Sequence, residues 1–269
     1  MLDVSTPKVM GIMNLTPDSF YDGGKITGIA SAMAHAAMMV EEGVDIIDIG
    51  AMSSRPGAKI SNPDEELEKI IPVIEGILHI FPEMLISIDT IHSSVADRAL
   101  VAGAHIINDI SAGNYDNKML EAISEHGAAY IMMHMQGLPA DMQINPTYEN
   151  VVMDVLSFFS KKIHAARNQG IIDIVIDPGF GFGKNVDQNY MLLQSIDAFR
   201  IFDLPVMAGI SRKSMVYKPF NINAENALNG TTALHMIALQ KGVSILRVHD
   251  VKEAKQCIAL YDMLGKQKA

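Results

Sequence analysis

The sequence alternates eight times between a short apolar segment and a longer segment with helical periodicity. Most of the short segments are continuous apolar runs, which is typical of parallel strands buried on both faces. We predict strands over residues 8–13, 45–49, 85–89, 105–109, 129–133, 172–176, 205–208 and 244–248. We predict helices over residues 28–43, 64–81, 93–102, 117–126, 149–168, 187–197, 224–241 and 251–265.

Eight strand–helix units in 269 residues fit a (β/α)8 barrel, a fold that needs about 250 residues. An open doubly wound sheet is the alternative, but the residues after the first predicted strand, 14–20, lack the Gly-rich turn of that fold. No linker or change of composition divides the chain. We therefore predict an α/β protein, a TIM barrel of parallel strands that forms a single domain over residues 1–269.

Composition and charge exclude several classes of protein. Apolar residues make up 49% of the chain and charged residues 19%, which excludes an intrinsically disordered protein. The net charge of −10 disfavours nucleic acid as a partner. Cys257 is the single cysteine, so no internal disulfide can form. No apolar run has the length of a membrane span and residues 1–11 do not resemble a signal peptide, so we expect a cytoplasmic protein.

Polar side chains gather where the predicted strands end. They are Asn14, Asp89, Asn108, Asp109, His134, Asp177, Arg247 and His249. In a (β/α)8 barrel the carboxyl ends of the strands form the active site, whatever its chemistry. The alternative is that each residue caps the turn that follows it. Capping can explain a polar residue at any single strand end, but it explains less well why nearly all the strands end in polar residues.

The residue types at these ends suggest a flat, donor-rich ligand. Asp89 and Asp177 are carboxylates at recessed positions, where an ionised group is costly without a donor-rich partner. A fused heterocycle with an amino-pyrimidinone edge offers two parallel N–H donors to one carboxylate. Asn108 supplies a donor and an acceptor to a neighbouring edge.

Four basic residues follow strands of the same acidic protein, namely Arg55, Lys213, Arg247 and His249. Their position at one rim suggests an anion site, most simply for phosphate or pyrophosphate. The last predicted helix begins directly after Asp250, so its N-terminus would add to the attraction for an anion.

The Gly-rich segment 179–185 resembles a phosphate-binding loop but lacks its spacing. That loop has four residues between its first glycine and the glycine before the lysine, whereas three residues separate Gly179 from Gly183 here. We interpret it as a tight loop that lets Phe182 approach a flat ligand. The alternative, that Phe180 and Phe182 are ordinary core residues, stays open. The sequence contains no zinc-ligand spacing and no nucleophile motif.

Several stretches of the chain resemble the dihydropteroate synthase family of folate biosynthesis, along nearly the whole length. They are GIMNLTPDSFYDGG (11–24), DIGAMSSRPGA (48–58), SIDT (87–90), INDISAG (107–113), MHMQG (133–137), IDPGFGFGKN (176–185), GISRKS (209–214), GTTALH (230–235) and RVHD (247–250). The resemblance implies a (β/α)8 barrel that forms a homodimer. It also implies an enzyme, a Mg²⁺-dependent transferase. The reaction would condense 6-hydroxymethyl-7,8-dihydropterin pyrophosphate with p-aminobenzoate, by an SN1-like mechanism, to 7,8-dihydropteroate and pyrophosphate.

The resemblance also implies a role for individual residues. The pterin would contact Asp89, Asn108, Ile110, Met133, Asp177, Phe182, Gly209, Lys213 and Arg247. The p-aminobenzoate pocket would contain Phe20, Ser54, Pro56 and Ser214, and pyrophosphate would contact Asn14, Ser54, Arg55, Arg247 and His249. Asn14 would also bind Mg²⁺, while Lys213, Arg247 and Asp18 would act in catalysis.

One position departs from the family pattern, which commonly has Ser-Thr-Arg-Pro where this chain has Ser53-Ser54-Arg55-Pro56. The missing methyl group would change the fit of the pocket, and with it the response to sulfonamides, rather than the chemistry. Two alternatives stay open. A pterin-binding methyltransferase domain would lack the Ser-Arg-Lys and Ser-Arg-Pro segments, and a non-catalytic pterin-binding paralogue would have lost phosphate ligands.

Overall fold

The computed structural model describes residues 3–15, 28–52, 60–137, 142 and 146–266. Eight parallel strands form one sheet in the order β6-β5-β4-β3-β2-β1-β8-β7. The strands are β1 (Lys8–Asn14), β2 (Ile46–Gly50), β3 (Leu85–Asp89), β4 (Ile106–Asp109), β5 (Ala129–Met133), β6 (Ile174–Asp177), β7 (Met207–Ala208) and β8 (Ile245–Val248). Each predicted strand is present, with its ends shifted by no more than two residues.

The sheet closes into a barrel between β6 and β7. Ile176 forms a parallel bridge with Val206, and the Ile176 amide donates to the carbonyl oxygen of Pro205 at 3.0 Å. The assigned strand β7 has only two residues, shorter than the predicted 205–208. Proline has no N–H to donate to the ladder, which helps to explain why the strand starts after Pro205.

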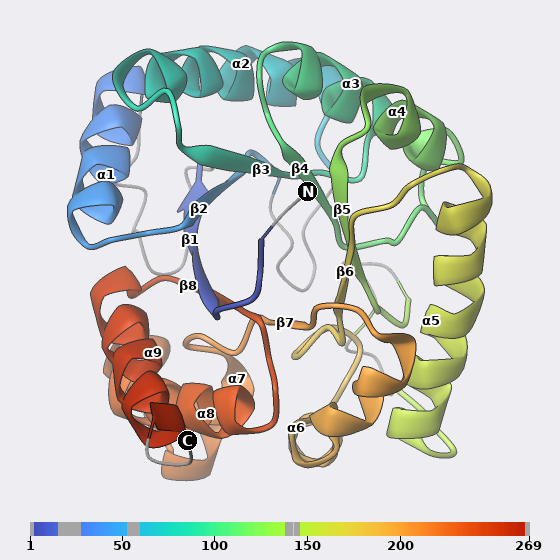
Figure 1. Ribbon diagram of the computed structural model, residues 1–269. Coiled ribbons are helices and arrows are strands. Elements are labelled where there is room, and N and C mark those ends of the chain that lie inside the picture. Colours follow the sequence, from blue (N-terminus) through green and yellow to red (C-terminus); the bar gives the residue numbers. More distant parts are fainter. Residues whose placement is uncertain (1–2, 16–27, 53–59, 138–141, 143–145, 267–269) are drawn as a thin grey trace.

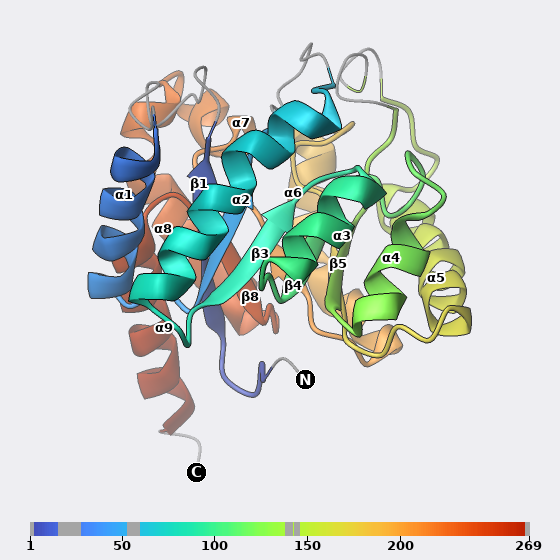
Figure 2. The same cartoon turned by 90° about the horizontal axis from the view of Figure 1, so that it is seen from above.

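Helices surround the barrel, as the view along its axis shows (Figure 1). They are α1 (Ile29–Glu41), α2 (Pro63–Ile80), α3 (Ser93–Val101), α4 (Met119–His126), α5 (Val151–Asn168), α6 (Val186–Gln194), α7 (Ser214–Tyr217), α8 (Leu228–Gln240) and α9 (Val251–Lys266). Figure 2 shows α1, α2 and α3 side by side on the outside of the strands. The alternation confirms the predicted α/β class and the single-domain (β/α)8 barrel.

Two predicted helices are divided in the structure. The segment 187–197 becomes α6 followed by a 3-10 helix, η1 (Ile196–Phe202), and 224–241 becomes η3 (Ala224–Asn226) followed by α8. The expected loop 209–223 contains the short helix α7 and a 3-10 turn, η2 (Lys218–Phe220). These elements are too short to show a helical apolar period, so periodicity alone does not predict them.

The interior of the barrel has an apolar lower layer and a polar upper layer. The lower layer packs the inward side chains of Met10, Ile46, Ile106, Ile131, Val175, Met207 and Ile245. Side chains two residues apart on a strand point to the same face. The next inward positions are therefore Asp48 above Ile46, Asn108 above Ile106, Asp177 above Val175 and Arg247 above Ile245. The strand period thus carries four polar side chains to the carboxyl end of the barrel.

In the part of the chain that the structure describes, no helix is long and apolar enough to cross a membrane.

Candidate active site

One narrow cavity opens at the carboxyl end of the barrel. Its empty space, counted together with the open solvent at its mouth, amounts to about 270 Å³. Its lining consists of Asp89, Asn108, Ile110, Met133, Asp177, Phe182, Gly209, Lys213 and Arg247. These are the nine residues for which the sequence predicted contact with a pterin. They come from six strands and the loops that follow them, so the fold alone brings them together.

Arg247 connects the polar side chains inside the barrel. Its Nε lies 2.6 Å from Oδ2 of Asp48, and its Nη2 lies 2.7 Å from Oδ2 of Asp89. Asn108 donates from Nδ2 to the same Asp48 oxygen at 3.1 Å. The guanidinium therefore bridges two buried carboxylates, one of which also orients Asn108.

Two oxygen atoms of this network have no partner within the described residues. They are Oδ1 of Asp48 and Oδ1 of Asn108, and both are fully buried. A buried acceptor without a hydrogen bond is costly, and such atoms are rare in folded proteins. Since Asn108 lines the cavity, its Oδ1 suits an N–H donor of a bound ligand.

The charged groups of the cavity titrate away from their ordinary ranges. Burial raises the pKa of Asp89 to about 7, against the opposing attraction of Arg247. Burial also raises the pKa of Asp177, an effect that the Lys213 ammonium partly offsets. In turn, burial lowers the pKa of Lys213 to about 8, despite the nearby Asp177. Shifts in pKa that arise from burial together with a specific neighbouring charge, and that occur in a cleft, are typical of functional sites.

The loop after β6 forms one wall of the cavity. Phe182 lines it, whereas Phe180 is completely buried in the apolar core outside the barrel. Phe180 is therefore an ordinary core residue, whereas the approach of Phe182 to a flat ligand stays a prediction. Lys213 donates from Nζ to the Phe180 carbonyl oxygen at 2.5 Å, and its Nζ lies 4.5 Å from the centre of the Phe182 ring.

Lys184 holds this loop in place from its buried side. Its Nζ donates to the carbonyl oxygens of Gly179 and Phe182, both at 3.0 Å. It also lies 3.0 Å from Nδ1 of His134, at the end of β5. Gly179 has a φ of +72°, and a Cβ there would collide with the His134 carbonyl oxygen. The segment that resembled a phosphate-binding loop is thus wrapped around its own lysine.

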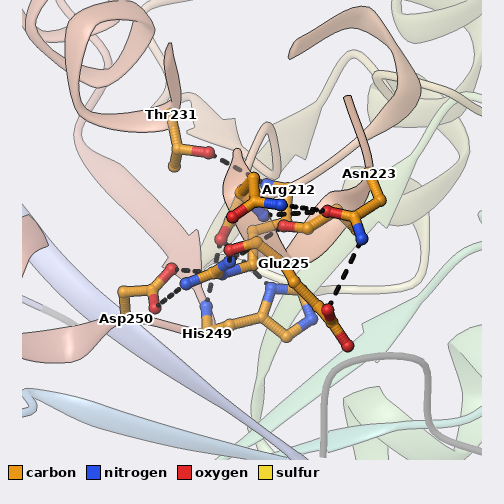
Figure 3. Close-up of polar contacts among 9 residues, drawn as sticks. Arg212, Asn223, Glu225, Thr231, His249 and Asp250 are labelled. Atoms are coloured by element: carbon orange, nitrogen blue, oxygen red, sulfur yellow. Dashed lines mark hydrogen bonds and ion pairs between the residues drawn. The ribbon is translucent and has the colours of Figure 1, made fainter. Parts of the chain in front are cut away.

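Arg212, which directly precedes Lys213, connects three loops (Figure 3). Its guanidinium forms a bidentate ion pair with Asp250 at 2.7 and 2.8 Å. It also donates to the carbonyl oxygens of Ala224 and Glu225 at 2.8 and 2.7 Å. Arg212 has a φ of +54°, an uncommon value for a residue other than glycine. These contacts fix the turn that presents Lys213 to the cavity.

The remaining predicted site residues divide into two groups. Asn14 ends β1, Ser214 begins α7, and His249 follows β8. None of these three is among the residues that line the cavity. Asp18, Phe20, Ser54, Arg55 and Pro56 lie outside the described residues, so their assigned roles stay predictions.

The residues present fit Mg²⁺ in one particular way. No group of three His, Cys, Asp or Glu side chains that could hold a metal occurs in the described ranges. Mg²⁺ is often bound through one or two protein oxygens together with phosphates of the substrate. The partly exposed amide of Asn14 offers one such oxygen at the rim.

Known proteins resemble this chain over nearly its whole length. A model of the pterin-binding enzyme family matches residues 10–249. Dihydropteroate synthase of Escherichia coli strain K12 is 43% identical over 263 residues, which are 97% of this chain and 93% of that protein. The chain belongs to the dihydropteroate synthase family.

Solved structures of this family superpose on nearly the whole chain. The Yersinia pestis dihydropteroate synthase in complex with a sulfonamide drug has a TM-score of 0.95 and 40% identity, covering 98% of this chain and 96% of that one. The Xanthomonas albilineans dihydropteroate synthase with 4-aminobenzoic acid has a TM-score of 0.91 and 38% identity, covering 98% of this chain and 95% of that one. The predicted family, and the expectation of an enzyme of the transferase class, are thereby confirmed.

Sequence reasoning assigned no role to several residues that organise the site. Asp48 was expected only as part of a strand, although a carboxylate between Ile47 and Ile49 in a buried strand is itself a signal. It lies two residues after Ile46, which faces the barrel interior, so the strand period turns Asp48 inward as well. No comparable signal marked Arg212, whose contacts with Ala224, Glu225 and Asp250 lie far along the chain.

We expect the Gly209→Ala substitution to block the cavity without disturbing the fold. A Cβ at this position would lie 3.6 Å from Nζ of Lys213 and 3.9 Å from Oδ2 of Asp177, which are ordinary contact distances. In the presence of a flat ligand the same methyl group overpacks the slot, so affinity for a pterin should fall by about 1–3 kcal/mol. Calorimetric titration measures the affinity, and thermal melting measures the stability.

Gly265→Ala, on α9, is the matched control because a Cβ there would meet nothing within 4 Å. Unchanged pterin affinity in Gly209→Ala, with the fold intact, would show that the ligand binds elsewhere.

Proposed function

We propose that the protein condenses 6-hydroxymethyl-7,8-dihydropterin pyrophosphate with p-aminobenzoate, giving 7,8-dihydropteroate and pyrophosphate. The observation that carries the proposal is the cavity itself. Within one slot it combines two buried carboxylates, the unpartnered Oδ1 of Asn108, an arginine and a lysine. A pterin ring presents complementary N–H donors and ring acceptors along its edges, and two flat apolar faces.

The edges and the faces of the pterin would meet different residues. Asp177 and Asp89 would accept N–H donors, and each new hydrogen bond would favour the ionised carboxylate that burial now disfavours. Met133, Ile110 and Phe182, which form one apolar cluster, would contact the faces. Arg247 would stack on the ring while it stays paired with Asp48 and Asp89.

Pyrophosphate departure requires neutralisation of negative charge at the rim. Arg247 lies there, with Asn14 and His249 at the ends of the neighbouring strands β1 and β8. Ser54 and Arg55 complete the proposed set. Asn14 would hold Mg²⁺ together with pyrophosphate oxygens, and the ion, when bound, would stabilise the charge of the leaving group.

The proposed chemistry needs no nucleophile on the protein. When the C–O bond to pyrophosphate breaks, its electron pair leaves with the pyrophosphate, and positive charge develops on the pterin methylene group. The amine of p-aminobenzoate then attacks this carbon and loses a proton. Prearranged charges and proximity supply the catalysis, with Lys213 near the reacting carbon and Asp18 near the developing positive charge. Ser214, with Phe20, Ser54 and Pro56, would form the p-aminobenzoate pocket that sulfonamides also enter.

We expect the Asp177→Asn substitution to weaken binding of the pterin pyrophosphate by about 1.5–3 kcal/mol, the worth of a charged hydrogen bond. Asp177 accepts from the Gly179 amide through Oδ1 at 2.8 Å, and an asparagine oxygen can preserve that contact. The other end would then present an NH₂ group to the N–H donors of the pterin. Calorimetry measures the loss, and Asp187→Asn on the exposed first turn of α6 is the matched control. Equal pterin affinities of both variants would overturn the pocket assignment.

We further propose a cytoplasmic homodimer. The support for a dimer is a set of exposed apolar side chains on three elements that each contact α7, namely Tyr190 and Met191 of α6, Phe220 of η2 and Ile237 of α8. Sedimentation equilibrium should give twice the mass of the chain, whereas the mass of one chain would contradict the dimer.

A further inference from the structure

His249 is held by Ser211 through two contacts with a single hydroxyl group. The backbone amide of His249 donates to Oγ of Ser211 at 3.2 Å, and Nδ1 of the imidazole lies 3.1 Å from the same oxygen. Ser211 is buried and follows β7, whereas His249 follows β8, so this pair joins two neighbouring loops. The same region contains the Arg212 ion pair with Asp250 (Figure 3).

The number of hydrogen bonds that the Ser211 hydroxyl group can donate and accept determines which nitrogen of His249 carries the proton. A serine hydroxyl has one hydrogen to donate and two lone pairs that accept. One lone pair takes the His249 amide N–H. Within the described ranges, Nδ1 of His249 is the one acceptor that this hydroxyl contacts. Nδ1 therefore accepts from Ser211, and the imidazole proton lies on Nε2.

We propose that Ser211 is a positioning residue that holds His249 as the neutral Nε2–H tautomer, so that His249 donates a hydrogen bond to pyrophosphate rather than contributing a positive charge. The pyrophosphate part of this inference rests on the proposed function; the tautomer does not. An imidazolium would need Ser211 to accept two N–H groups. The hydroxyl hydrogen would then lack an acceptor among the described residues.

The charges around His249 favour the same state. Arg247 comes from β8, Arg212 and Lys213 come from the loop after β7, and Asp250 begins the approach to α9. Burial and the three cations lower the pKa of His249 to about 3, against the opposing attraction of Asp250. Asp250 is itself engaged by the Arg212 guanidinium. The positive side-chain charge around His249 therefore comes from lysine and arginine residues, and it does not vary with histidine titration.

The direct test is ¹⁵N nuclear magnetic resonance of histidine-labelled protein. The chain has nine histidines, and the signals missing from His249→Gln identify His249. We expect a pyridine-type Nδ1 and a pyrrole-type Nε2 that persist between about pH 5.5 and 8, the range in which an ordinary histidine changes charge. A protonated Nδ1, or a titration midpoint near the ordinary value, would overturn the inference whatever the protein catalyses.

A binding experiment tests the role of Ser211. We expect Ser211→Ala to weaken binding of inorganic pyrophosphate about two- to tenfold, the worth of one neutral hydrogen bond, and to let the His249 proton distribute between Nδ1 and Nε2, which the ¹⁵N shifts report. Ser94→Ala, on the exposed start of α3, is the matched control. The affinity ratio between wild type and His249→Gln should stay constant with pH. A ratio that rises as the pH falls would show a cationic His249, and unchanged affinity in Ser211→Ala would remove its positioning role.

The tautomer of His249 and its contact with pyrophosphate can be disproved separately. If wild-type protein does not bind pyrophosphate, the anion site of the proposed function and the binding part of this inference are both wrong. The resonance experiment then still decides the tautomer.

Discussion

Replacing Arg247 with methionine is expected to lower the free energy of unfolding by about 3–5 kcal/mol, because it leaves two buried carboxylates without their cation. Asp48 is completely inaccessible to solvent, and the side chain of Asp89 is 11% exposed. Both lose a short ion pair, and neither can regain water inside the barrel.

The matched control is Arg98→Met on the exposed face of α3, which should change stability by no more than about 0.5 kcal/mol. Denaturant unfolding at neutral pH measures both variants. The Arg247→Met variant should regain part of its stability as the pH falls, because Asp89, with a pKa already raised to about 7, then takes up a proton. A loss below about 1 kcal/mol would mean that the three side chains do not form a coupled buried network.

Replacing Lys213 with methionine is expected to reduce kcat by about 10²–10³-fold, the usual effect of removing one preorganised group that stabilises charge in the transition state. The ammonium group reaches across the cavity to the Phe180 carbonyl oxygen and the Phe182 ring, so it lies where a bound pterin would react. Its pKa of about 8 leaves it mainly protonated at neutral pH.

Lys218→Met, five residues further along the chain and exposed, controls for the loss of one positive charge. Steady-state kinetics measures kcat, and thermal melting checks the fold. A wild-type kcat together with a lowered melting temperature would make Lys213 a structural residue.

The carboxyl ends of the strands are the most predictable part of the site. Strands with continuous apolar runs show their boundaries in the sequence, so the pattern of apolar residues is enough to locate Asp89, Asn108 and Asp177 at strand ends. Once the barrel closes, the strand period brings these side chains and Arg247 to one cavity. The family resemblance added Ile110, Met133 and Gly209, which periodicity alone would have left in the core.

The groups that hold the cavity in shape could not be predicted, because their contacts join distant parts of the chain. Arg247 and Asp48 are 199 residues apart, and Lys184 meets His134 across 50 residues. A sequence shows that such a residue is charged and near a strand, but not which partner lies opposite. The same limit applies to Arg212, which the sequence places beside Lys213 at a strand end, whereas its guanidinium lies against Asp250.

The central claim is tested most directly by pyrophosphate release from the purified protein with Mg²⁺, the pterin pyrophosphate and p-aminobenzoate. We expect sustained release only when both substrates are present, with one dihydropteroate formed for each pyrophosphate. Tight binding of the pterin without release would instead indicate a non-catalytic paralogue or a methyltransferase domain. If the protein neither releases pyrophosphate nor binds the pterin, the proposed function is wrong.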